Sequence, residues 1–137
     1  MNIPVLVLLG FSAWTLLTLF ASIGVYRWSR ILTGCASIAE WRADLPQGSD
    51  WYQRAMRAHM NCVENLPVFA ALVLLAAVLR LDSPWFEGLA LTVLPMRVLQ
   101  STTHVLSGRS RAVLVRFAFF TVQMACFLVM AALIALR

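Results

Sequence analysis

Four long apolar stretches, covering about residues 3–26, 58–79, 84–106 and 112–136, constrain this chain more than any other feature. A hydrocarbon core of roughly 30 Å takes about 20 helical residues to cross, and each stretch is that long. Because lipid offers no hydrogen bonds, the backbone of each stretch must satisfy itself as a helix. The sequence therefore predicts an all-α integral membrane four-helix bundle, with residues 1–137 forming one domain.

Composition excludes a water-soluble fold. Of the 137 residues, 61% are hydrophobic and only 12% are charged, whereas soluble domains carry about 25% charged residues. The formal net charge of +5 comes with no basic stripe on a soluble scaffold, so no nucleic-acid partner is expected. The three cysteines form no CxxC pair and no ligand spacing with histidine, so we expect no metal site.

The N-terminal stretch is expected to be a retained helix rather than a cleaved signal peptide. It lacks a basic n-region and a small-residue cleavage site, and its apolar run exceeds 20 residues.

All basic residues are arginines, and their placement predicts the orientation. Eight lie in or beside the loops at 27–51 and 107–111, and two lie at the opposite ends of the helices. By the positive-inside rule both loops are expected in the cytoplasm and both termini outside. The short chain and its all-arginine basic content suggest a bacterial inner membrane. The eight are Arg27, Arg30, Arg42, Arg54, Arg57, Arg109, Arg111 and Arg116, against Arg80 and Arg137.

Two of the expected helices carry polar stripes. At 100° per residue, one stripe falls within an arc of about 80° and comprises Arg54, Arg57, Asn61 and Glu64. The next helix carries Arg97, Gln100 and His104 at offsets of 3 and 7. A charge near the bilayer centre costs roughly 2.5–3.5 kcal/mol, so Glu64 and Arg97 should face the bundle interior or a subunit interface, near a partner of opposite sign.

Two interpretations of these stripes remain open. Glu64 and Arg97 could pair with each other and hold helices together. Alternatively, the stripes line a pocket for a charged ligand, in which the excess guanidinium groups bind carboxylates.

The segment from Arg54 to Phe69 resembles the signature of the MAPEG family, the membrane-associated proteins in eicosanoid and glutathione metabolism. The family pattern, roughly R-x-x-R-A-x-x-N-x-x-E-x-x-P-x-F, is matched by RAMRAHMNCVENLPVF. The four-helix layout, the long first loop and the short basic third loop are similar too, so the resemblance covers most of the chain.

This resemblance implies a homotrimer that binds glutathione, as co-substrate, between neighbouring subunits near the cytoplasmic side. Asn61 and Glu64 would hold the glutathione backbone, with Glu64 on its amino group. Arg57 would stabilise the site, and Arg27 would reach in from the adjacent subunit. The expected binding set is completed by Arg97, Gln100 and His104.

The resemblance also implies a catalytic arginine on the last helix that stabilises the glutathione thiolate, and Arg116 matches it best. The alignment there needs a gap, so Arg109 and Arg111 compete for that role. The chain departs from the prostaglandin-type members at four positions, where Met60 replaces Arg, Gln100 replaces His, His104 replaces Tyr and Phe117 replaces Ser.

The function implied is a glutathione-dependent transferase or peroxidase acting on lipophilic electrophiles that arrive from the membrane lipid. The altered positions leave an alternative, a non-catalytic MAPEG-like protein that binds lipid or glutathione. A small multidrug exporter is disfavoured, because such exporters need a glutamate in the first helix and residues 1–26 contain none.

Overall fold

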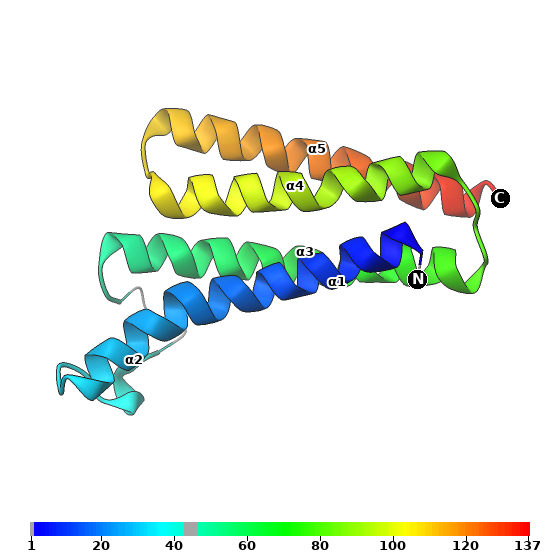
Figure 1. Cartoon of the computed structure of the whole chain (residues 1–137). Coiled ribbons are helices and arrows are strands. Elements are labelled where there is room, and N and C mark those ends of the chain that lie inside the picture. Colours follow the sequence, from blue (N-terminus) through cyan, green and yellow to red (C-terminus); the bar gives the residue numbers. More distant parts are fainter. Residues whose placement is uncertain (1, 43–46) are drawn as a thin grey trace.

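The computed structural model describes residues 2–42 and 47–137, and this part of the chain is helical with no strand. The first rod begins with α1 (Ile3–Thr18), continues through the π-helix η1 (Leu19–Gly24) and ends with α2 (Val25–Leu32). A short 3₁₀ turn, η2 (Ile38–Glu40), follows. The other helices are α3 (Asp50–Val78), α4 (Pro84–Leu106) and α5 (Ser110–Ala135). Figure 1 shows both termini at one end of the bundle and α2 at the other.

Two helices extend beyond their apolar stretches. The first rod continues to Leu32 rather than stopping near Tyr26, and α3 begins at Asp50 rather than near Ala58. The loop expected at 27–51 is therefore shorter, and its residues 43–46 lie outside the described part. At the start of α3, the Ser49 side chain accepts a hydrogen bond from the Tyr52 backbone N–H at 3.3 Å. This N-cap starts the helix two turns before hydropathy marks it.

The start of α4 follows its sequence signals. Asp82 or Ser83 is expected as the N-cap before Pro84. The structure uses Ser83, whose side chain accepts from the Phe86 N–H at 3.4 Å, and Pro84 occupies the first turn.

Among the described residues, three helical spans are long and apolar enough to cross a membrane: 3–32, 50–78 and 110–135. The fourth helix, α4, has 23 residues but is more polar, because Arg97, Gln100, Ser101 and His104 lie along it. All four of these side chains are buried between helices. The polarity of α4 is thus directed into the bundle and away from lipid.

The bundle core has an apolar half and a polar half. In the apolar half, near the termini, Phe69 of α3 lies between two rings, tilted against Phe11 of α1 and stacked on Phe127 of α5, with ring centroids 5.7 Å apart in both pairs. Val93 and Met130 complete the packing there. Toward the loops at 33–49 and 107–109, the buried positions become polar and include Arg97, Gln100 and His104. Of all helix pairs, α4 and α5 contact each other most extensively.

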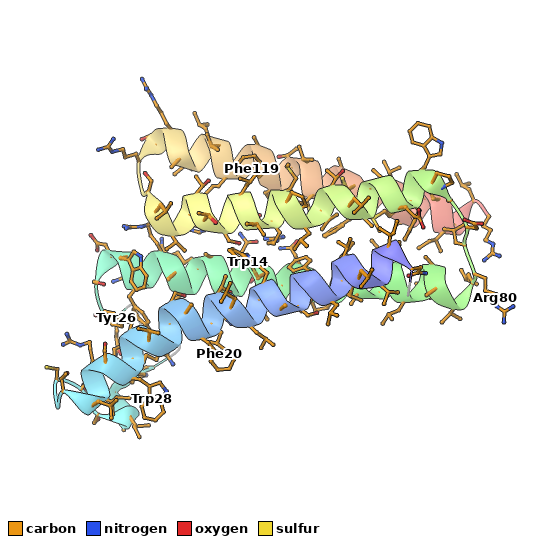
Figure 2. All side chains as sticks on the ribbon, viewed as in Figure 1. Trp14, Phe20, Tyr26, Trp28, Arg80 and Phe119 are labelled. Atoms are coloured by element: carbon orange, nitrogen blue, oxygen red, sulfur yellow. The ribbon has the colours of Figure 1, made fainter. Side chains whose placement is uncertain are left out.

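Aromatic side chains close the loop end of the molecule. Tyr26 stacks on Tyr52 with ring centroids 4.4 Å apart, and Trp41 packs edge-on against both rings. In Figure 2 Tyr26 and Trp28 lie at this end and Arg80 lies at the opposite one. The arginine-rich loops and the arginine-poor turn at Arg80 therefore lie at opposite ends of the bundle.

Candidate functional site

A pocket of about 490 Å³ opens between α3, α4 and α5 in the polar half of the bundle. It brings together five of the eight residues predicted to form the site: Asn61, Glu64, Gln100, His104 and Arg116. The other lining residues are Asn65, Val113, Phe117 and Phe120. Within this single chain, therefore, the polar stripes of α3 and α4 meet the arginine of α5 around one volume.

The pocket has two chemically different walls. Amides from α3 and α4 form one wall, together with the Glu64 carboxylate and the His104 ring. Valine and phenylalanine side chains of α5 form the other wall, together with Arg116, the charged residue that α5 contributes to the lining. Such a pocket can hold a polar, charged molecule against an apolar one.

Of the three candidate arginines on or before α5, only Arg116 lines the pocket. Arg109 and Arg111 are exposed at the start of the helix. Arg116 lies two turns farther along, where its half-buried guanidinium reaches the pocket. Its position at the pocket thus separates Arg116 from the other two candidates, and its role on a thiolate stays a prediction.

Arg97 lies behind the pocket and is fully buried, with 0% of its surface exposed. Its Nη1 donates to Gln100 Oε1 at 2.9 Å and, at the limit of hydrogen bonding, to Asn61 Oδ1 at 3.5 Å. Within residues 2–42 and 47–137 it has no ion pair, and its Nε and Nη2 have no hydrogen-bond partner. The expectation that Arg97 lies near a group of opposite sign is therefore wrong among the described residues. The neutral amides of Gln100 and Asn61 take that place.

Glu64 is not buried within this chain. Its side chain is exposed at the pocket rim, and among the described residues it forms no ion pair with Arg97. Within the part of the chain that the structure describes, Glu64 and Arg97 therefore do not neutralise each other. The carboxylate is left available to a ligand.

Arg27 and Arg57 are not part of the pocket in this chain. Arg27 Nε donates to the Tyr52 hydroxyl at 2.6 Å, and its guanidinium lies 5.5 Å from the Trp41 ring centroid. Arg57 is exposed on α3. Nearby Arg54 has a structural contact, because its Nε donates to the Val105 carbonyl at 3.2 Å and ties α3 to the end of α4.

Two buried amides of the site are absent from the sequence prediction. Asn65 lines the pocket and donates to the Asn61 side chain, and fully buried Gln123 donates to Gln100. The spacing along the helix indicates both residues. Asn65 follows Asn61 by four residues, and Gln123 follows Arg116 by seven, so each shares a helix face with a predicted residue.

Nearly the whole chain matches one known protein family. The model of the MAPEG family matches residues 5–136, which is nearly the whole chain. This chain belongs to the MAPEG family. No curated protein and no solved structure matches it.

As a MAPEG protein with three strongly apolar helical spans, the chain is an integral membrane protein. The family comprises membrane proteins of glutathione-related transferase and peroxidase chemistry, and glutathione is its general co-substrate. The MAPEG signature on α3 supplies Asn61 and Glu64 to the pocket, so the motif and the cavity coincide.

Proposed function

We propose that this MAPEG protein is a glutathione-dependent transferase or peroxidase acting on lipophilic electrophiles within the membrane. One observation carries the proposal: a single pocket joins Glu64, the amides and Arg116 to the apolar wall of α5. The polar part suits a charged tripeptide, and the apolar part suits a molecule that partitions into lipid.

The charged groups of glutathione find complements in this pocket. Glutathione carries one ammonium, two carboxylates and one thiol. The Glu64 carboxylate is the acidic group at the pocket and binds the ammonium. Arg116 stabilises the thiolate, because an adjacent guanidinium lowers the pKa of a cysteine thiol from about 8.5. At neutral pH more of the ligand is then the nucleophilic thiolate.

The reaction follows from that thiolate. Its sulfur attacks an electrophilic carbon, a new C–S bond forms, and the leaving group, for example a halide, departs with the electrons of the broken bond. With a lipid hydroperoxide, the sulfur attacks the terminal peroxide oxygen and releases an alcohol. A second glutathione then displaces water from the sulfenic acid and yields glutathione disulfide. Val113, Phe117 and Phe120 hold the electrophile beside the sulfur.

The homotrimer belongs to the same proposal. Exposed charges on a membrane helix are costly, and Arg57 and Glu64 are both exposed in the isolated chain. A neighbouring protomer that covers this face shields both residues and brings its own Arg27 to a glutathione carboxylate. With the arginine-rich end in the cytoplasm of a bacterium, glutathione enters from that side and the electrophile enters laterally from lipid.

Purified protein in detergent or nanodiscs tests the proposal. We expect glutathione to raise the melting temperature, because it binds the folded state. We expect turnover of a halonitrobenzene or a lipid hydroperoxide. Arg116→Ala should lower kcat/KM on the order of a hundredfold, as the loss of a charge-stabilising donor does in other enzymes. Arg111→Ala, an exposed arginine on the same helix, is the matched control and should retain activity.

An absence of glutathione binding, or equal activity of the two variants, would overturn the proposal. Binding without turnover would instead favour the alternative, a MAPEG protein that holds glutathione or lipid without catalysis. Phe117 is the specific feature in favour of that alternative, because it lines the pocket beside Arg116 where the prostaglandin-type pattern has a serine hydroxyl.

A further inference from the structure

The side-chain amide of Gln100 is fixed from two sides at the base of the pocket. Its Oε1 accepts from Arg97 Nη1 at 2.9 Å and from Gln123 Nε2 at 2.9 Å. All three side chains are buried, with exposed fractions of 4% for Gln100 and 0% for the other two. Two donors of this kind leave the amide a single orientation.

Hydrogen-bond chemistry determines which end of the Gln100 amide faces Arg97 and Gln123. A guanidinium has only donors, so the atom that it meets must be an oxygen. Gln123 gives the same answer independently, because its Nε2 also donates to the Phe119 backbone carbonyl at 3.1 Å. A carbonyl only accepts, so Gln123 presents its nitrogen, and the Gln100 atom facing it is the oxygen.

Asn61 repeats this arrangement on α3. Asn65 Nδ2 donates to the Asn61 backbone carbonyl at 2.7 Å and to Asn61 Oδ1 at 3.0 Å. Because the backbone carbonyl only accepts, the Asn65 atom is the nitrogen, and the Asn61 atom beside it is the oxygen. Arg97 Nη1 approaches that oxygen as well, at 3.5 Å.

The side-chain oxygens of Asn61 and Gln100 thus accept hydrogen bonds from neighbouring side chains, and the two NH₂ groups remain. Within the part of the chain that the structure describes, neither the Asn61 nor the Gln100 side-chain nitrogen has a hydrogen-bond partner. Both residues line the pocket, which also contains the Arg116 guanidinium. We infer that Gln123, Arg97 and Asn65 are positioning residues that hold these two amides with their N–H donors available to the pocket.

The inference rests on the proposed function and makes it more specific. The part of glutathione that lies against Asn61 and Gln100 is an acceptor, a carboxylate or a peptide carbonyl oxygen, and not its ammonium. The ammonium lies at the Glu64 rim instead. Gln123 does not line the pocket, so its effect on the ligand passes through Gln100.

Gln123→Leu tests this role because it deletes the donor at similar volume. The Gln123 Oε1 atom is buried without a partner, so the substitution also removes an unsatisfied acceptor. The melting temperature without ligand should therefore be unchanged or higher. Glutathione affinity should fall roughly fivefold, which corresponds to one neutral hydrogen bond. In a Gln100→Leu background, Gln123→Leu should have no further effect on affinity.

A measurement without ligand separates this inference from the proposed function. The Gln100 side-chain NH₂ resonance, assigned by its loss in Gln100→Leu, should shift in Gln123→Leu and should shift again when glutathione is added to the wild type. An unshifted resonance in Gln123→Leu, or unchanged glutathione affinity, would overturn the inference. If the wild type bound no glutathione, the proposed function would fail, and the resonance in the free protein would decide the inference alone.

Gln100→Glu supplies a second, isosteric variant. One carboxylate oxygen replaces Oε1 and accepts from Arg97, and the other replaces the NH₂ donor with an acceptor. We expect the variant to fold and to lose glutathione affinity at least tenfold. Retained affinity in a folded Gln100→Glu protein would show that no donor is needed there, and the inference would be wrong.

Discussion

The Arg97 guanidinium lies 5.2 Å from the centroid of the Phe11 ring, where the apolar half of the core meets the polar half. A positive charge favours the face of an aromatic ring, and the contact covers part of a buried cation that has no carboxylate partner among the described residues. Its Nη1 is nevertheless the group that joins Gln100 to Asn61. This position predicts opposite effects of one substitution on stability and on binding.

Arg97→Met removes a poorly compensated buried charge at similar volume. The free energy of unfolding should stay the same or rise by about 1 kcal/mol, since apolar replacement of buried charges is often neutral or stabilising. Glutathione affinity should fall, because Gln100 loses one of its two donors. Denaturation in detergent and a glutathione titration measure the two effects. Arg97→Lys keeps the charge without the planar fork and should be the less stable variant; the reverse order would contradict this account.

Glu64→Gln tests the assignment of the ammonium. The substitution keeps shape and removes the negative charge at the pocket rim. Glutathione affinity should fall roughly tenfold, as for the loss of a charge-assisted hydrogen bond. An analogue of glutathione without the amino group should bind the wild type and the variant equally. If the variant lost affinity for both ligands alike, Glu64 would not contact the ammonium.

Tyr52→Phe tests the anchoring of Arg27. The ring keeps its stacking on Tyr26, but the 2.6 Å bond from Arg27 Nε to the hydroxyl is lost. We expect a loss of about 1 kcal/mol in the free energy of unfolding. Thermal denaturation in detergent measures it. Tyr26→Phe is the comparison, because its hydroxyl accepts from the exposed Ser49 N–H, which water can satisfy instead, so its cost should be smaller.

Arg80→Gly should stabilise the turn between α3 and α4. Arg80 has φ of 53°, the left-handed region that disfavours residues with a Cβ. It follows the end of α3 in a Schellman arrangement, with the Leu81 N–H donating to the Ala76 carbonyl and the Arg80 N–H to the Ala77 carbonyl. Glycine should raise the free energy of unfolding by about 1 kcal/mol. Arg80→Ala keeps the strain and should give no gain, which separates backbone relief from loss of charge.

The sequence predicts the helices well and their polar ends poorly. Hydropathy reports where a segment is apolar, so it locates the centre of α3 but not the turns that begin at Asp50. Those turns are helical because Ser49 caps them and because Tyr52 and Ala55 pack against the rest of the protein. The first rod likewise continues past Tyr26 to Leu32, where the sequence is too polar for hydropathy to mark a helix.

For the candidate site, the sequence likewise predicts some features and misses others. Spacing along α3 and α4 predicts correctly that Asn61 and Gln100 belong to polar faces, and the family signature adds Glu64. Spacing cannot say which polar groups meet across helices, so it assigns Arg97 an acidic partner and overlooks Gln123. Arg27 remains a prediction, because its role depends on a second protomer.

The π-helix η1 gives the first rod a change of phase. A π-bulge amounts to one extra residue in an α-helix, and one residue corresponds to about 100° of rotation. Everything beyond Gly24 is therefore turned about the rod axis relative to the lipid-facing side chains before Thr18. Deleting one residue between Leu19 and Gly24 would turn Arg27 away from Tyr52 and leave the membrane-crossing turns of α1 intact. The π-helix therefore sets the direction of the Arg27 guanidinium independently of α1.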